Sequence, residues 1–210
     1  MLEIEYKGAN SVVIAGKDKD VSLWVDPLSN AESYKAGKGT VVYLATEQRF
    51  LPAASEDVLS LEGPGEYETG PFWIHGIAAQ RHIDTPEQGK QATIYRIDVG
   101  EFRVAVLGNI DPGLSEDQLE VVGTVDFLIL PVGGGGYTLD ATAAAKIVRQ
   151  IEPKVVIPIH YTGQGVSYEV PQDAVETFTQ ELGAPVETMP KVKMKSVSSI
   201  PATLTVYQLG

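Results

Sequence analysis

Short apolar segments separated by turn residues run along most of the chain and restrict it to a strand-rich fold. Leu2, Ile4 and Tyr6 alternate with acidic residues, and a period of two predicts a strand with one buried face. Residues 41–44 form a continuous apolar run, which is typical of a strand buried on both faces. The same patterns predict strands at residues 12–14, 21–25, 58–61, 72–74, 93–97, 102–107, 127–132, 155–159 and 204–209.

Helix signals gather in the second half of the chain. Ser115 and Gln118 have the spacing of a capping box, in which each side chain bonds the other residue's backbone. Asp140 is a good N-cap ahead of an alanine-rich segment with apolar residues at helical spacing. We therefore expect helices over residues 115–121, 141–151 and 172–182.

The chain length of 210 residues suits one domain, which we expect to span residues 1–210. Residues 14–27 and 97–112 share a pattern of strand, turn, strand and Asp-Pro. This repetition suggests two similar halves, about 1–95 and 96–210, which would build two stacked sheets with helices outside. An equally weighted alternative is that hairpins simply look alike.

The charge balance argues against several kinds of partner. The chain has 16 basic and 28 acidic side chains and a formal net charge of -12, so we expect neither nucleic acid nor membrane as a partner. A small anionic molecule held locally remains compatible with this charge. Cysteine is absent, and no stretch has the composition of a signal peptide or a membrane span. We expect a cytoplasmic protein.

Five short motifs in register resemble one family along nearly the whole chain. The motifs are Gly63–Glu68, Val106–Asn109, Leu130–Gly135, Thr138–Ala141 and Val156–Tyr161. They resemble the ascorbate-6-phosphate lactonase-like group of the metallo-β-lactamase-fold superfamily, whose members are described as metal-dependent hydrolases. The resemblance implies an α/β fold arranged as a four-layer αββα sandwich.

The family's metal signature is lost. Such proteins hold two divalent metals, usually zinc or manganese, with a Thr-His-x-His-x-Asp-His sequence after the strand that corresponds to residues 41–44. Here Glu47 and Arg49 stand in place of two histidines, and Leu51 and Pro52 replace the aspartate and the third histidine. Arginine, leucine and proline side chains do not ligate cations, and arginine repels them.

The other ligand positions are only partly retained. The resemblance places His82 and His160 at histidine ligand positions, Asn109 at the position of a metal-bridging aspartate, and Ala9 at that of the family's first histidine. A catalytic zinc normally has three protein ligands. We therefore expect no metal cofactor.

Two arrangements of the remaining polar residues are open. Glu47, His82, Asp84 and His160 could form a rearranged site for a single divalent metal, zinc or manganese. Alternatively, Arg49 could pair with Glu47 or with Asp26 and so replace the cations, and we favour this ion pair.

The glycine run that includes Gly133, Gly134 and Gly135 offers a separate possibility. Backbone N–H groups between a strand and a helix start can bind a phosphate or carboxylate. The favoured interpretation is a turn that needs positive φ angles, with Asp140 capping the helix.

Two functions follow from these patterns. The preferred hypothesis is a non-catalytic binding, regulatory or oligomer-forming module, possible partners being a small anionic molecule and further copies of the chain. The alternative is a hydrolase of a small anionic ester, lactone or phosphorylated metabolite. In it His160 would act as base, with His82 or Glu47 as its partner or as a metal ligand.

Overall fold

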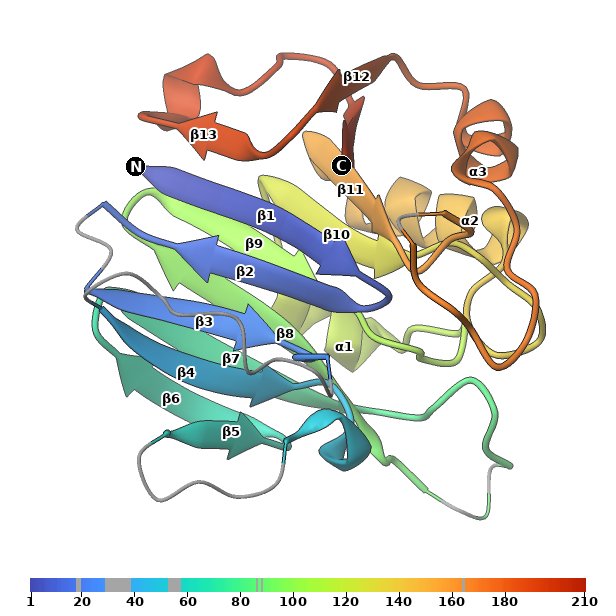
Figure 1. The fold of residues 1–210 in the computed structure, drawn as a ribbon, viewed down its shortest axis with the longest axis horizontal. Helices are drawn as coiled ribbons and strands as arrows, with labels where there is room; N and C mark the ends of the chain where they lie inside the picture. Colours follow the sequence, from blue (N-terminus) through green and yellow to red (C-terminus); the bar gives the residue numbers. More distant parts are fainter. Residues whose placement is uncertain (18–19, 29–38, 53–57, 86, 88, 164) are drawn as a thin grey trace.

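The structure, a computed structural model, describes residues 1–17, 20–28, 39–52, 58–85, 87, 89–163 and 165–210. These residues form two facing β-sheets with helices outside one of them (Figure 1). The chain starts in one sheet, passes to the other at Gly63–Gly65, and places strands in both sheets near its C-terminus.

The first sheet has six strands in the order β13-β1-β2-β3-β4-β5. Strands β13, β1, β2 and β3 are antiparallel, whereas β3, β4 and β5 run parallel. Their bounds are Leu2–Gly8 for β1, Ser11–Ala15 for β2, Val21–Val25 for β3, Thr40–Ala45 for β4, Ser60–Glu62 for β5 and Val192–Met194 for β13.

The second sheet has eight strands in the order β12-β14-β11-β10-β9-β8-β7-β6. The end from β6 to β9 is antiparallel, and the end from β9 to β12 is parallel. Their bounds are Gly65–Thr69 for β6, Phe72–Ala79 for β7, Ala92–Val99 for β8, Phe102–Val106 for β9, Phe127–Pro131 for β10, Val155–Ile159 for β11, Val186–Met189 for β12 and Thr205–Leu209 for β14.

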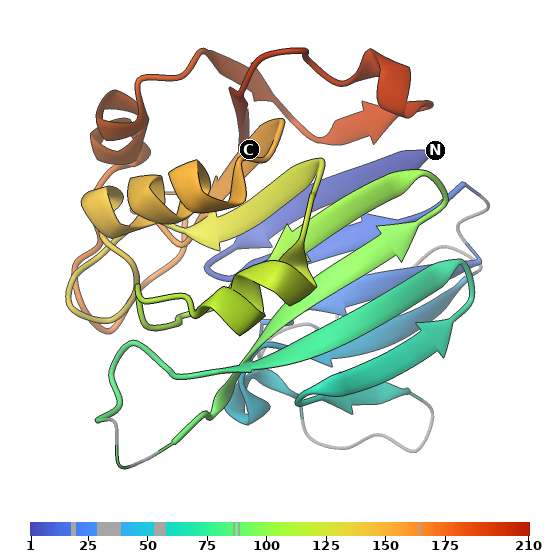
Figure 2. The same cartoon turned by 180° about the vertical axis from the view of Figure 1, so that it is seen from behind.

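Two apolar cores hold the layers together. One lies between the sheets and includes Ile14, Leu44 and Phe127. The other lies between the eight-stranded sheet and the helices seen in Figure 2, and includes Val148 and Phe178. Strands β10 and β11 are buried along their whole length because they lie between both cores. The helices are α1 (Glu116–Val122), α2 (Ala141–Ile151) and α3 (Val175–Leu182), and the short 3-10 turns are η2 (Gln48–Phe50) and η4 (Val197–Ser199).

Most expected elements are present, with shifted ends. The capping box of Ser115 and Gln118 and the Asp140 cap both form as expected. The third helix begins at Val175 rather than at residue 172, so that expectation was wrong at its start. The strand expected at residues 58–61 lies at Ser60–Glu62, and strands β6, β12 and β13 were not among the expected strands.

The two outer layers differ in the part of the chain that the structure describes. Helices α1, α2 and α3 cover the eight-stranded sheet, whereas no α-helix among the described residues covers the six-stranded sheet. The division into two halves near residue 95 stays a prediction. Of the helices described, none is both long and apolar enough to cross a membrane.

Candidate functional site

The polar residues that the sequence singled out follow the ends of parallel strands. Asp26 follows β3, Glu47 lies just beyond β4, and His160 follows β11 directly. Backbone bonds join these loops across the two sheets, from Thr93 N to Thr46 O at 2.8 Å and from His160 N to Ala9 O at 2.9 Å. The ends of parallel strands are where α/β proteins usually bind ligands, so a ligand site is expected at this rim.

A buried carboxylate held by two arginines forms the centre of this rim. Glu47 is 2% exposed, and Arg49 donates to both of its oxygens, from Nε at 2.8 Å and from Nη2 at 3.0 Å. Arg81 lies 3.5 Å from the same carboxylate and makes two short bonds to Asp84, at 2.7 and 2.6 Å. The expected pair between Arg49 and Glu47 is therefore present, within a network that joins two loops.

Asn109 and Asp26 also form hydrogen bonds with other residues of this rim. The Asn109 amide donates to Glu47 Oε1 at 3.2 Å. Asp26 accepts from the backbone N–H and the hydroxyl of Thr46, at 2.7 and 2.6 Å. Burial raises the pKa of Asp26 to about 7, although the hydrogen bonds from Thr46 oppose the shift. Asp26 therefore fixes the loop that carries Glu47 and does not pair with Arg49.

His160 is held from several directions. Its backbone adopts a left-handed conformation, with φ 51°, and its N–H donates to the Tyr6 hydroxyl at 3.0 Å. The ring stacks on Tyr137 and lies 4.8 Å from the Tyr168 ring centroid, while Nδ1 is 3.0 Å from Gln172 Oε1. Burial lowers the pKa of His160, so its ring is neutral near neutral pH.

Arg49 and His160 share a cavity of about 530 Å3, a size that suits a small ligand. Its wall mixes apolar side chains with polar and charged ones, and the Arg49 guanidinium lies over the rings of Phe50 and Tyr137. Asn10 also lines the cavity, and both polar atoms of its amide are buried without a hydrogen-bond partner among the described residues. The full lining is Ala9, Asn10, Asp26, Pro27, Leu28, Arg49, Phe50, Leu51, Pro52, Tyr137, His160, Ser167 and Glu169.

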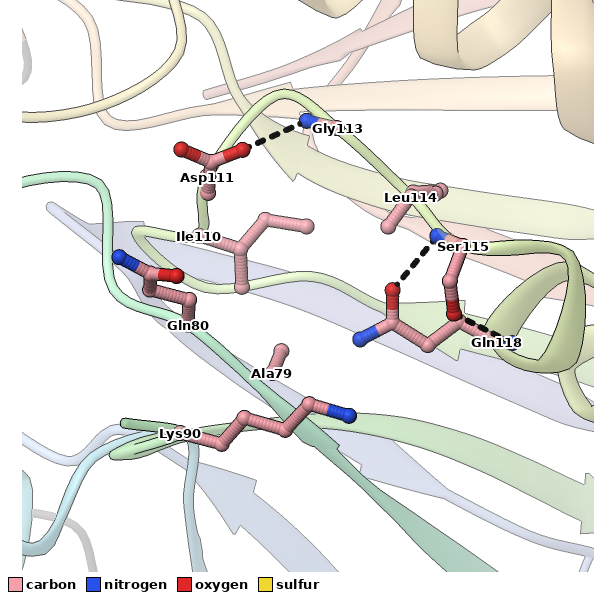
Figure 3. A pocket seen from close by; sticks show the side chains of 9 residues that line it. All are labelled: Ala79, Gln80, Lys90, Ile110, Asp111, Gly113, Leu114, Ser115 and Gln118. Carbon is pink, nitrogen blue, oxygen red and sulfur yellow. Dashed lines mark hydrogen bonds between the residues drawn. The ribbon is translucent and has the colours of Figure 1, made fainter. Parts of the chain in front are cut away.

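A second, smaller hollow of about 150 Å3 lies beside the start of α1 (Figure 3). Its polar groups are largely used within the protein. The Gln118 amide bonds Ser115 N and Ala78 O, and Asp111 accepts from Gly113 N. The larger cavity is thus the better site, because it holds an unsatisfied amide and a histidine with a fixed ring.

Comparison with known proteins identifies the family. A family model described as the beta-lactamase superfamily domain matches residues 3–160. A UPF0173 protein of Pyrococcus furiosus is 42% identical over 168 residues, covering 69% of this chain and 77% of the relative. The chain belongs to the beta-lactamase superfamily. A protein of Archaeoglobus fulgidus named UPF0173 metal-dependent hydrolase is 24% identical over 155 residues, covering 70% of this chain and 67% of the relative.

A solved structure of the superfamily shows that the fold is shared. It is a candidate zinc-dependent hydrolase of the metallo-β-lactamase superfamily from Thermotoga maritima, with a TM-score of 0.75, 20% identity and full coverage of both chains. At this identity the likeness establishes the metallo-β-lactamase fold expected from the sequence, and nothing about activity.

The superfamily's metals do not fit the donor atoms at this rim. Both Glu47 oxygens face guanidinium groups, and both Asp84 oxygens are bound by Arg81. The atoms left over include His82 Nδ1 and Asn109 Oδ1, which are buried and unpaired among the described residues, and the ring of His160 lies on the cavity beyond Arg49. Two separated imidazoles and a neutral amide supply too few ligands and too little charge for two dications beside two arginines.

The expected single-metal arrangement is likewise not assembled. No three potential metal-ligating side chains come together within the part of the chain that the structure describes. Arg81 lies between Glu47 and Asp84, and His82 is held by its backbone N–H to Asn109 O at 2.8 Å. His160 lines the cavity, whereas His82 does not.

The glycine run forms a turn. Gly134 and Gly135 have φ near +65°, and Asp140 accepts from Ala143 N as the cap of α2. The carboxylate of Asp173 lies near Gly134, which disfavours an anion there. The favoured interpretation of the sequence was therefore correct for Asp140.

Several residues at or beside the cavity gave no signal of a site in the sequence. Asn10 and Tyr137 come from two loops, and Tyr168 and Gln172 come from the loop between β11 and α3 that also carries His160. Asn10 does lie next to Ala9, which the resemblance places at the position of the family's first histidine. Only the comparison of that position with the family could have indicated it.

Proposed function

We propose that this chain binds a small molecule in the cavity between Arg49 and His160 and works there without a dinuclear metal centre. The proposal rests on one observation: Arg49, Arg81 and Asn109 all bond the Glu47 carboxylate. A dication at this point would have to displace two guanidinium groups, each of which repels it. The arginines would then join the loops that metals join in other members.

The lining supports a ligand with an apolar body and one polar end. Phe50, Leu51 and Pro52 offer an apolar wall and Arg49 offers hydrogen bonds, while the buried, unpaired Asn10 amide would have to turn toward a ligand to bond it. A buried amide without a partner is costly, and a ligand that bonds it would remove that cost.

The charges limit an anionic ligand to a single negative group near Arg49. Glu169 also lines the cavity, as does Asp26, which carries its charge only above about pH 7, so a multiply charged ligand would be repelled by these acids. Because Arg49 already bonds Glu47, its attraction for a second anion is reduced. A monocarboxylate with an apolar body suits this lining best.

Hydrolysis of a small anionic ester, lactone or phosphorylated metabolite is the second candidate. The names of the relatives favour it over a purely non-catalytic module. In this chain His160 would act as the base, because burial keeps its ring neutral and Gln172 holds it. His82 lies outside the cavity lining, so it would not be a direct partner.

Metal analysis and thermal unfolding test the proposal together. Protein purified without chelator should hold well under one equivalent of zinc, manganese or iron, and added zinc or manganese should not raise its melting temperature. Stoichiometric metal accompanied by a rise in melting temperature would overturn the metal-free part.

Benzoate and benzamide form a matched pair of probes for the cavity. Benzoate should raise the melting temperature more than neutral benzamide, and Arg49→Met should remove this difference. Hydrolysis of nitrophenyl acetate faster than by His160→Gln would favour the second candidate. No difference between the two probes in the wild type would contradict an anion site at Arg49.

A further inference from the structure

The ring of His160 is fixed by one side chain that the sequence did not single out. Gln172 lies just before α3, and its Oε1 is 3.0 Å from His160 Nδ1. Its Nε2 donates to Val170 O at 3.1 Å and lies 3.4 Å from Pro171 O. Both ends of this amide are therefore engaged.

These contacts determine which way the amide faces. An amide nitrogen is a donor only, and an amide oxygen is an acceptor only. If the two ends were exchanged, the oxygen of Gln172 would face two backbone carbonyl oxygens, and neither contact would be a hydrogen bond. Hence Oε1 faces His160, and the ring must donate from Nδ1.

The backbone around the ring keeps this arrangement in place. A Cβ at Gly133 would lie 2.2 Å from His160 O and 2.6 Å from Gln172 Oε1, so only glycine allows the loop after β10 to approach so closely. Tyr137 stacks on one side of the ring and Tyr168 lies against it. The ring therefore has little freedom to rotate away from Gln172.

We propose that Gln172 is a positioning residue that holds His160 as the Nδ1–H tautomer and presents Nε2 to the cavity as a hydrogen-bond acceptor. His160 lines the cavity and Gln172 does not, so the ring edge away from Gln172 faces the ligand. The class of ligand group that meets this ring can then be inferred, and this step rests on the proposed function. The group that meets His160 is a hydrogen-bond donor, such as a hydroxyl, an N–H or a bound water, while any carboxylate lies toward Arg49.

Nitrogen-15 NMR of the histidine rings tests the tautomer directly in the protein without ligand. The chain has 3 histidines, and His160→Gln assigns the signal of His160. At about pH 8, where histidine is neutral, Nδ1 should carry the proton and Nε2 should show the shift of an unprotonated ring nitrogen. A wild-type spectrum with the proton on Nε2 would overturn the inference without any need for a variant.

Variants of Gln172 separate positioning from packing. Gln172→Leu should lose the Nδ1–H preference, whereas Gln172→Glu gives up the bonds to Val170 O and Pro171 O but keeps an acceptor for Nδ1–H and should retain the preference. Gln180→Leu, an exposed glutamine on α3, should leave the spectrum unchanged. An unaltered tautomer in folded Gln172→Leu would also contradict the inference. Failure of benzoate to bind would count against the proposed function alone, because the tautomer is measured without it.

Discussion

Arg49 donates to both carboxylate oxygens of Glu47, the residue that caps the 3-10 turn on which Arg49 lies. The Glu47 side chain is only 1% exposed. A carboxylate so deeply buried needs a partner charge, because leaving water costs it several kcal/mol. Arg81 contributes from a second loop at 3.5 Å. The stability of the cavity rim thus depends on ion pairs between two loops.

Arg49→Met should lower the free energy of unfolding by about 2 to 3 kcal/mol. This is below the usual range of about 3 to 5 kcal/mol for breaking a buried pair, because Arg81 remains and Arg49 is partly exposed. Adding Glu47→Gln should recover part of the loss, since the uncompensated charge is then gone. Urea unfolding measures both effects, with exposed Arg103→Met as the control. Equal losses in Arg49→Met and Arg103→Met would refute the buried pair.

Restoring the family's ligands should create a metal site. The variant with Glu47→His, Arg49→His, Leu51→Asp, Pro52→His and Asn109→Asp removes one guanidinium and supplies imidazoles and carboxylates in the family's register. We expect zinc or manganese to be retained after purification and to raise the melting temperature. If a folded variant gains no metal, the register used for residues 46–52 is wrong.

Two glycines of one loop should respond to alanine for different reasons. Gly133→Ala places a Cβ against His160 O and Gln172 Oε1, and such overpacking costs about 2 kcal/mol. It should also shift the ring signals of His160. Gly136→Ala meets no atom but keeps a φ of 71°, so it should cost about 1 kcal/mol and leave those signals in place. Equal shifts of the signals in both variants would contradict the close approach.

Stability should fall as pH rises through the range in which Asp26 titrates. The pKa of Asp26 is about 7 in the folded protein, against an ordinary value of 3.8, because of burial. Between these values the folded state binds a proton that the unfolded chain has released, so stability decreases with rising pH. The unfolding free energy of the wild type minus that of Asp26→Asn should drop by about 2 kcal/mol between about pH 5 and 8. The exposed Glu101→Gln should show no such slope, and a flat difference for Asp26→Asn would refute the shift.

The sequence predicts best those elements whose signals come from residues close together in the chain. Ser115 and Gln118 lie three positions apart and cap α1 as expected. The third helix starts late because the backbone of Asp173 is bonded to other loops, its N–H to Gly133 O and its C=O to Thr162 N, and Ala174 at the N-cap offers no side-chain cap. Strand β12 was missed because it is largely exposed and carries no apolar alternation.

The site was only partly predictable for a similar reason. The pair between Arg49 and Glu47 is local, and the unsuitability of Arg49 as a ligand was clear from its chemistry alone. Arg81 joins the network across 34 residues, and Gln172 reaches His160 across a loop. Such contacts depend on how the folded chain brings distant loops together, and the spacing of residues in the sequence does not predict this.

The hydrogen bond from the His160 backbone to the Tyr6 hydroxyl spans 154 positions of the chain. Residue 6 sits on β1, opposite Val12, and a one-residue slip of that strand would turn its side chain to the other face. The pairing register of the β1–β2 hairpin therefore affects the backbone of a residue that follows β11 in the facing sheet. An insertion that shifts this register would move the Tyr6 hydroxyl away from His160, although Tyr6 itself does not line the cavity.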